Sequence, residues 1–218
     1  MNYSLIVQST YNEIQIALFN ADQLIETVSE SKKTASKNIL STLNRLLDTH
    51  GCTIDAIQYI GVNQGPAPFT TLRVLITTIN GVAFAKKIPL IGINGLKAML
   101  QENHNADFPI TLCLYNAFNN DAYFGIDALD KLENGWKNID ILLSRIQVQF
   151  PDTMVRTIGC GTEFFKEKLI DVFGDKLFIP EPLPEFPSVK FLHLLVKKEF
   201  EAGNTVQEIS PLYLKKAI

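Results

Sequence analysis

The chain has 218 residues, of which 46% are hydrophobic and 20% charged, a composition typical of a globular protein with a sizeable core. Its net charge of −3 and pI of about 5.6 exclude a broadly basic surface for non-specific nucleic-acid binding. Three widely spaced cysteines, no basic leader and no apolar run of membrane-spanning length predict a cytoplasmic protein without membrane contact.

The first third of the chain predicts an antiparallel three-stranded meander. The segments YSLIVQS, EIQIALF and QLIETVSE are rich in β-formers and are separated by turn residues at 10–12 and 20–22. In the second segment Ile14, Ile16 and Leu18 alternate with their neighbours, which is typical of a half-buried strand.

Strands and helices then alternate up to residue 101, which indicates parallel strands joined by crossovers. An amphipathic helix is predicted over residues 36–50, with Gly51 ending it. The strand YIGVN leads into a helix from Leu72 to Phe84, and the strand PLIGIN leads into a helix over 95–101.

A polar linker at 101–109 precedes a second set of elements. Strands are predicted at ITLCLYNA, DAYFGIDAL, WKNIDILL and TMVRTIG, helices over 162–174 and 188–202, and an extended tail over 209–218. Both halves open with strands and continue with helices. This order predicts a two-lobed α/β protein of the actin/Hsp70/sugar-kinase (ASKHA) type, with lobes at 1–102 and 103–218, each a mixed sheet with helices.

The loop GPAP before the second helix allows two interpretations. A turn between a strand and a helix N-terminus is a common anion site, because free N–H groups point outward there. However, Pro66 and Pro68 have no N–H, and Gly65 is the one glycine in the loop. The structural interpretation is a stiffened turn, with Thr70 or Thr71 capping the helix.

Apolar residues occupy more than one side of the helix that follows this loop. Leu72, Leu75, Ile79 and Val82 form one stripe, while Ile76 lies off it. Such a helix is usually buried on more than one side. Both burial within the chain and packing against a second subunit remain open from the pattern alone.

Two polar positions suggest opposite chemistries. Gln8 ends the first strand where an Asp would hold Mg²⁺ in the ASKHA architecture, and an amide cannot supply that charge. Cys160 lies in a strand–GCG–helix turn where a nucleophilic thiol could be activated, although a tight glycine turn with an incidental cysteine is the favoured interpretation. No H-x-x-x-H or C-x-x-C spacing predicts a metal site.

Together these segments resemble one family. The unit GPAPFTTLR is similar to the GPGSFTGLR signature of the bacterial TsaB (YeaZ) proteins of tRNA threonylcarbamoyladenosine biosynthesis. SKNILSTLNRLL, PLIGINGLKAM, YNAFNNDAYFGI, RTIGCG and SPLYLK follow in the matching order. The chain departs from the family pattern at Ala35, Ala67, Pro68 and Thr71, and at Asn116 and Asn120 in a stretch that is usually more charged.

The resemblance implies a pseudo-enzyme that has no catalytic or metal-binding residues. It implies pairing with the TsaD-type transferase, which modifies the tRNA adenosine beside the anticodon, and an assembly that includes a TsaE-type ATPase. It also implies a homodimer in isolation, contact with tRNA only through the complex, no cofactor of its own, and ATP or ADP at the subunit interface. The alternative from the residues is a cysteine-dependent hydrolase or peptidase-like enzyme using Cys160.

The expected partner surface is formed by the two N-terminal helices. Its residues are Ile39, Leu40, Leu43, Leu46, Leu47, Leu72, Leu75, Ile76, Ile79 and Val82. The signature loop contributes Gly65, Pro66, Phe69, Thr70 and Arg73. On this interpretation Leu75→Asp would abolish pairing while leaving the monomer folded.

Overall fold

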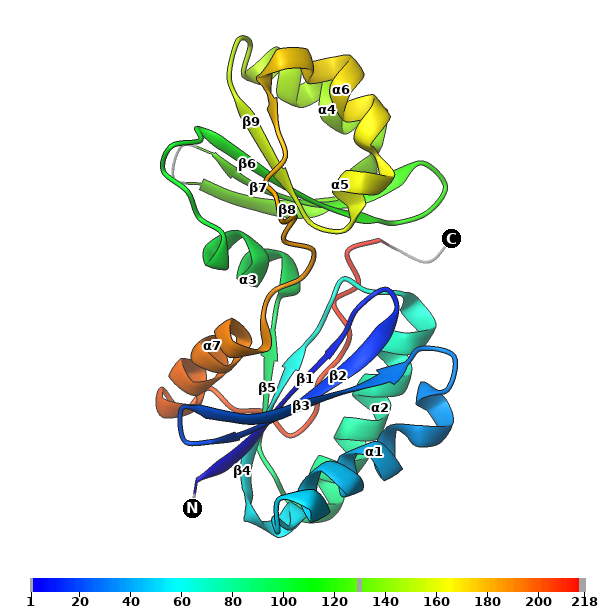
Figure 1. Cartoon of the computed structure of the whole chain (residues 1–218), viewed down its shortest axis with the longest axis vertical. Coiled ribbons are helices and arrows are strands. Elements are labelled where there is room, and N and C mark those ends of the chain that lie inside the picture. Colours follow the sequence, from blue (N-terminus) through cyan, green and yellow to red (C-terminus); the bar gives the residue numbers. More distant parts are fainter. Residues whose placement is uncertain (1, 129–130, 216–218) are drawn as a thin grey trace. The chain divides into compact units, whose positions relative to one another are not determined.

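A computed structural model describes residues 2–128 and 131–215, which form two compact units. Unit 1 comprises Met1–Gly95 and Ser188–Leu212, and unit 2 comprises Leu96–Pro187 and Tyr213–Ile218. Each unit contains one five-stranded mixed sheet with helices on both faces (Figure 1).

The sheet of unit 1 has the strand order β3-β2-β1-β4-β5. Its first three strands form the predicted antiparallel meander, and β4 and β5 continue it in parallel. The bounds are β1 (Tyr3–Ser9), β2 (Glu13–Asn20), β3 (Gln23–Ser31), β4 (Ile57–Asn63) and β5 (Leu90–Ile93).

Two helices cover one face of this sheet and a third covers the other (Figure 1). The first face carries α1 (Ala35–Thr49) and α2 (Phe69–Lys86), which confirm the two helices predicted there. The opposite face carries α7 (Val189–Glu201). Gly61 permits α7 to approach β4, since a Cβ at Gly61 would lie 2.4 Å from Cγ2 of Val196.

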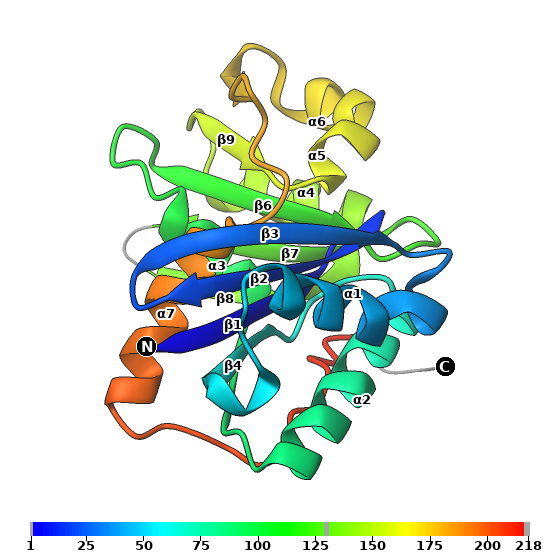
Figure 2. The ribbon, with the colours of Figure 1, turned by 60° about the horizontal axis from the view of Figure 1, so that its bottom comes forward.

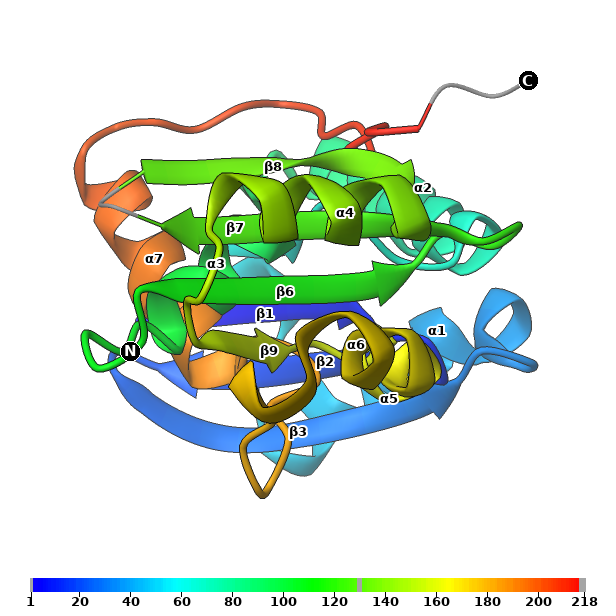
Figure 3. The ribbon, with the colours of Figure 1, turned by 90° about the horizontal axis from the view of Figure 1, so that it is seen from above.

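The sheet of unit 2 has the strand order β10-β9-β6-β7-β8. The helices α4 (Ile139–Gln149), α5 (Gly161–Phe164) and α6 (Lys166–Phe173) cover one face (Figure 3). On the other face α3 (Gly95–Glu102) packs Leu100 against Gly125. The bounds are β6 (Ile110–Asn116), β7 (Asp121–Ala128), β8 (Lys131–Asn138), β9 (Val155–Ile158) and β10 (Leu177–Phe178).

Two predicted elements of unit 2 differ from the structure. The strand predicted at WKNIDILL is the end of β8 followed by α4, because the Asn138 side chain accepts hydrogen bonds from the N–H groups of Asp140 and Ile141 and starts a helix. The helix predicted over 162–174 is broken at Phe165 into α5 and α6. Of the predicted tail, residues 216–218 lie outside the described part.

The division into units also differs from the predicted lobes 1–102 and 103–218. Unit 2 begins at Leu96, so most of α3 belongs to it, whereas α7 and the segment up to Leu212 return to unit 1. The side-chain amide of Asn80 on α2 holds this returning segment, because it accepts from the N–H and donates to the carbonyl of Ile209, at 3.0 and 2.8 Å. Such long-range return is not visible in local sequence patterns.

Candidate functional site

The signature loop between β4 and α2 keeps its polar groups within the protein. The Gly65 N–H donates to Oδ1 of Asn63 at 2.9 Å, and the Gly65 carbonyl accepts from the Gly95 N–H at 2.9 Å. Gly65 has φ of +100°, and a Cβ there would lie 2.8 Å from the Leu72 side chain, so only glycine fits. The loop therefore has no free glycine amide to offer a phosphate, and the structural interpretation is favoured.

The start of α2 differs from the predicted cap. Pro68 occupies the N-cap position and no side chain caps the helix. Thr71 is buried and Thr70 is exposed. The Arg73 guanidinium stacks on the Phe69 ring at 3.7 Å from its centroid, so these two signature residues form one exposed cation–π pair at the loop.

Most residues predicted for the partner surface lie in the core of unit 1. Eight of the ten point inward and pack in the cluster between the sheet and the two helices: Ile39, Leu43, Leu46, Leu47, Leu72, Leu75, Ile76 and Ile79. Leu40 is 50% exposed, and Val82 is half-buried. The eight core residues support the outer surface from beneath and do not form it.

Leu75 illustrates the consequence. Its side chain has no exposed surface, so Leu75→Asp would place an uncompensated carboxylate in the core of unit 1. The variant would unfold the monomer, contrary to the expectation from sequence. Loss of pairing in that variant would therefore say nothing about the interface.

The surface that α2 presents to solvent lies opposite these core residues. We call the outer α2 face the residues Thr70, Arg73, Val74, Thr77, Gly81 and Phe84, which are exposed or half-buried. Phe84 is 86% exposed, and a Cβ added at Gly81 would meet nothing within 4 Å. Gly81 and Phe84 were not among the predicted surface residues, although their spacing from Thr77 of four and seven places is a signal of one helical face.

A chain of amides occupies the end of β1. Nε2 of Gln8 donates to Oε1 of Gln15 at 2.8 Å, and Oε1 of Gln8 accepts from Nδ2 of Asn63 at 3.2 Å. Gln15 in turn donates to Oε1 of Glu13 at 2.9 Å. Gln8 is buried, and both the donor and the acceptor of its neutral amide form hydrogen bonds. Within residues 2–128 and 131–215 no three His, Cys, Asp or Glu side chains gather as a metal site.

Cys160 lies in the turn between β9 and α5. The N–H groups of Gly159 and Cys160 donate to the carbonyls of Pro184 and Glu185, at 2.8 and 3.2 Å. Burial, with a smaller effect from the Glu185 carboxylate, raises the pKa of the Cys160 thiol to about 12. A nucleophilic cysteine needs the opposite shift, so the geometry does not support the hydrolase alternative.

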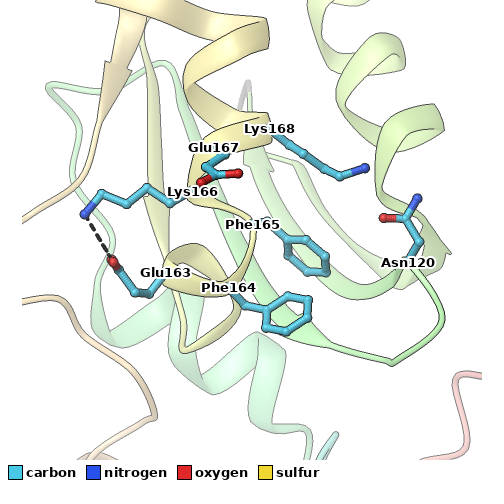
Figure 4. Close-up of a pocket in the computed structure, with 7 residues that line it drawn as sticks. All are labelled: Asn120, Glu163, Phe164, Phe165, Lys166, Glu167 and Lys168. Carbon is cyan, nitrogen blue, oxygen red and sulfur yellow. Dashed lines mark hydrogen bonds and ion pairs between the residues drawn. The ribbon is translucent and has the colours of Figure 1, made fainter.

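Unit 2 contains a cavity of about 410 Å³ beside α5 and α6, which sequence analysis did not indicate (Figure 4). The rings of Phe164 and Phe165 form one wall, and Asn120 and Lys168 lie across from them (Figure 4). Most polar groups of this cavity bind one another or a neighbouring residue: Asn120 donates to Asp140 at 2.7 Å, Lys168 pairs with Asp140, and Lys166 pairs with Glu163. These pairings engage Asn120, Glu163, Lys166 and Lys168, and Glu167 is the remaining charged side chain of the lining.

Comparison with solved structures defines the fold class. The chain superimposes on the YeaZ protein from Pseudomonas aeruginosa with a TM-score of 0.71 at 18% identity, over 98% of this chain and 100% of that one. It matches a Bacteroides thetaiotaomicron protein described as having an actin-like ATPase fold with a TM-score of 0.50 at 10% identity, over 89% and 95%. The chain has the two-lobed actin-like fold, as the sequence predicted.

Sequence comparison defines the family. The family model described as "TsaD: tRNA N6-adenosine threonylcarbamoyltransferase" matches residues 26–166. The tRNA threonylcarbamoyladenosine biosynthesis protein TsaB of Haemophilus influenzae is 24% identical, over 100% of this chain and 95% of its own length. That of Bacillus subtilis is 25% identical, over 98% and 94%. The chain belongs to the family that the TsaD model describes. Within that family it belongs to the TsaB (YeaZ) group of tRNA threonylcarbamoyladenosine biosynthesis proteins.

None of the helices in the described part of the chain is both long and apolar enough to cross a lipid bilayer.

Proposed function

We propose that the chain is a non-catalytic subunit that docks on a TsaD-type transferase through the outer α2 face and Leu40. In this role it supports threonylcarbamoylation of the tRNA adenosine beside the anticodon, in the cytoplasm. The observation that supports the proposal is that the Phe84 side chain is exposed on the same helical face as Gly81, where the backbone has no side chain and the space is open. An exposed aromatic anchor beside a position without a side chain suits close approach by a partner helix.

The core beneath this face favours docking without rearrangement. Leu72, Leu75 and Ile79 fix α2 against the sheet, and α1 lies alongside it (Figure 2). A rigid helix loses little conformational freedom on binding, which leaves more of the contact energy for affinity. A specific interface needs about 800 Å² from each partner, which two neighbouring helices can provide.

Two features support a non-catalytic role. The Gln8 amide stands where a metal-binding carboxylate would be needed, and both its donor and its acceptor are engaged by Gln15 and Asn63. The Cys160 thiol is held protonated by burial. We therefore assign the chemistry to the transferase subunit and do not propose a cysteine-dependent reaction.

We extend the proposal to the wider assembly. The TsaE-type ATPase joins the pair, and the same outer α2 face pairs two copies of this chain when the transferase is absent. ATP or ADP binds at the subunit interface and not to this chain alone. Calorimetric titration of ADP into the chain and into the pair tests the last point, and heat of binding with the chain alone would contradict it.

The central test is Gly81→Arg, co-expressed with the transferase subunit and analysed by size-exclusion chromatography. The long side chain projects into open space, so the monomer stays folded while the docking face is blocked. Leu194→Arg is the matched control, because Leu194 is an exposed apolar residue of α7 on the other side of the same sheet. We expect Gly81→Arg to elute as two separate proteins and Leu194→Arg as a complex. Stoichiometric co-elution of the folded Gly81→Arg variant would refute the docking face.

A further inference from the structure

Positive charge gathers along one side of α1. We call the basic ridge the residues Lys32, Lys33, Lys37 and Arg45, all exposed, which run from the β3–α1 turn along the helix. None of the four forms an ion pair with a carboxylate of the described residues, whereas Lys86, Lys168 and Lys197 each do. The four cations form an exposed basic strip on a chain whose net charge is −3.

The acid nearest in sequence, Glu30, is occupied by neutral groups. Its carboxylate accepts hydrogen bonds from Oγ1 of Thr34, Nδ2 of Asn38 and Oγ1 of Thr42, the last two at 3.2 and 3.1 Å. These donors, led by Thr34, lower the pKa of Glu30, with a smaller contribution from the charge of Arg45. Through these hydrogen bonds Glu30 links β3 to α1. Lys32, Lys33 and Lys37 form no ion pair with Glu30 and can bind another anion.

Most of the ridge lies away from the proposed docking face on α1, and only Lys37 borders it. Asn38 and Thr42 point toward β3, where they meet Glu30. At 100° per residue, Leu40 projects about 200° from each of them and so belongs to the α2 side. Arg45 follows Thr42 by three residues and stays on the β3 side, while Lys32 is fixed in the turn by its bond to the Tyr11 carbonyl at 2.8 Å. Lys37, three residues before Leu40, projects about 60° from it and borders the docking face. A partner on α2 therefore leaves Lys32, Lys33 and Arg45 accessible.

The chemistry of the ridge suits a phosphate backbone better than a protein. Ser31 presents an exposed hydroxyl beside Lys32 and Lys33, whereas the hydroxyls of Ser29 and Ser41 already donate to Glu13 and to the Asn38 carbonyl. Protein interfaces are depleted in lysine and centred on apolar side chains. Nucleic-acid backbones, in contrast, are held by Lys and Arg together with hydroxyl groups.

We propose that the basic ridge contacts the sugar-phosphate backbone of the RNA substrate while the transferase subunit holds the base to be modified. This inference rests on the proposed function, because it supposes that this chain sits beside an RNA-bound transferase. The ridge contributes a minority of the charge contacts, consistent with the acidic balance of the whole chain. It reads no base sequence.

The test is the salt dependence of tRNA binding by the assembled pair. Each phosphate contact adds about 0.7–0.9 to the magnitude of the negative slope of log K against log salt, so Lys33→Gln/Arg45→Gln should reduce that magnitude by about 1.5. The control, Lys190→Gln/Lys198→Gln, removes the same charge from exposed lysines of α7 on the opposite face of the sheet. We expect its slope to equal that of the wild type.

Each outcome is informative. An unchanged slope in the ridge variant, or an equal fall in the α7 variant, would overturn the proposal. Failure of the ridge variant to assemble with the transferase would mean that the ridge docks protein, which also overturns it. Chromatography of the wild-type pair separately reports on the proposed function. If no pair forms, the proposed function fails, and the ridge proposal, which rests on it, fails with it.

Discussion

The imidazole of His193 stacks flat on the ring of Phe19, with the centroids 4.0 Å apart and the planes 7° from parallel. His193 lies on α7 and Phe19 on β2, so this pair is one of the contacts that hold α7 to the sheet of unit 1. The side chain is buried, with the Asp22 carboxylate 3.7 Å from its Nε2 and Lys197 bonded to the same Asp22. The neutral ring suits this site.

This contact makes the stability of unit 1 sensitive to mild acid. Burial lowers the pKa of His193, and the partial compensation by Asp22 does not reverse the shift. Because the folded-state pKa lies below the ordinary value of 6.5, the unfolded chain binds the proton first. Stability from this group is complete above pH 6.5 and falls as the pH drops toward the folded-state pKa. Urea unfolding at pH 7.5 and 5.5 should show this loss, and His193→Phe should reduce it. Equal losses in both proteins would contradict the assignment.

Gly81→Ala should stabilise the protein. Gly81 lies inside α2 with open space around it, so alanine adds no clash and improves helix propensity. We expect the free energy of unfolding to rise by about 0.8–1 kcal/mol, measured by chemical denaturation. Gly51→Ala serves as the control: Gly51 has φ of +59°, so alanine there should destabilise. A loss of stability in Gly81→Ala would show that the glycine backbone is needed within the monomer.

Gln8→Glu should destabilise unit 1 at neutral pH. The substitution keeps the shape of the side chain but removes the Nε2 donor, so a carboxylate oxygen faces Oε1 of Gln15 in a buried site. A buried acceptor without its donor costs about 1–3 kcal/mol. At pH 5 a larger share of the carboxyl is protonated and can donate, so the loss should shrink. Thermal unfolding at both pH values measures this, and an equal loss at both would contradict the amide-chain explanation.

We expect the Cys160 thiol to react slowly with electrophiles. Its pKa of about 12, against an ordinary 9.0, lowers the thiolate fraction on the order of a thousandfold. We expect iodoacetamide to modify the folded protein at Cys160 far more slowly than the urea-unfolded chain, as followed by mass spectrometry. Cys160→Ala should likewise leave threonylcarbamoylation of tRNA intact in a complementation assay. Rapid labelling of the folded protein would restore the thiol as a candidate nucleophile.

Local patterns predicted the elements well where one influence dominated. The alternation at Ile14, Ile16 and Leu18 and the spacing in residues 36–50 are confirmed as β2 and α1. The prediction was wrong at WKNIDILL, where apolar residues suit strand and helix alike and a single cap, Asn138, decides for the helix. Thr70 or Thr71 was expected to cap α2, but Pro68 occupies the N-cap position and no side chain caps the helix.

The sequence by itself determined the type of fold, the family signature at GPAPFTTLR and the amide at Gln8, because these depend on local periodicity and residue identity. It could not decide which side of α2 is outside, since Leu72 and Leu75 are apolar whether they meet the sheet or a partner. Only the tertiary structure showed that Leu72 and Leu75 pack in the core against the sheet, so that Gly81 and Phe84 face solvent. Likewise, only the tertiary structure showed that Glu30 accepts hydrogen bonds from Thr34, Asn38 and Thr42, because these side chains meet Glu30 only when α1 packs beside β3.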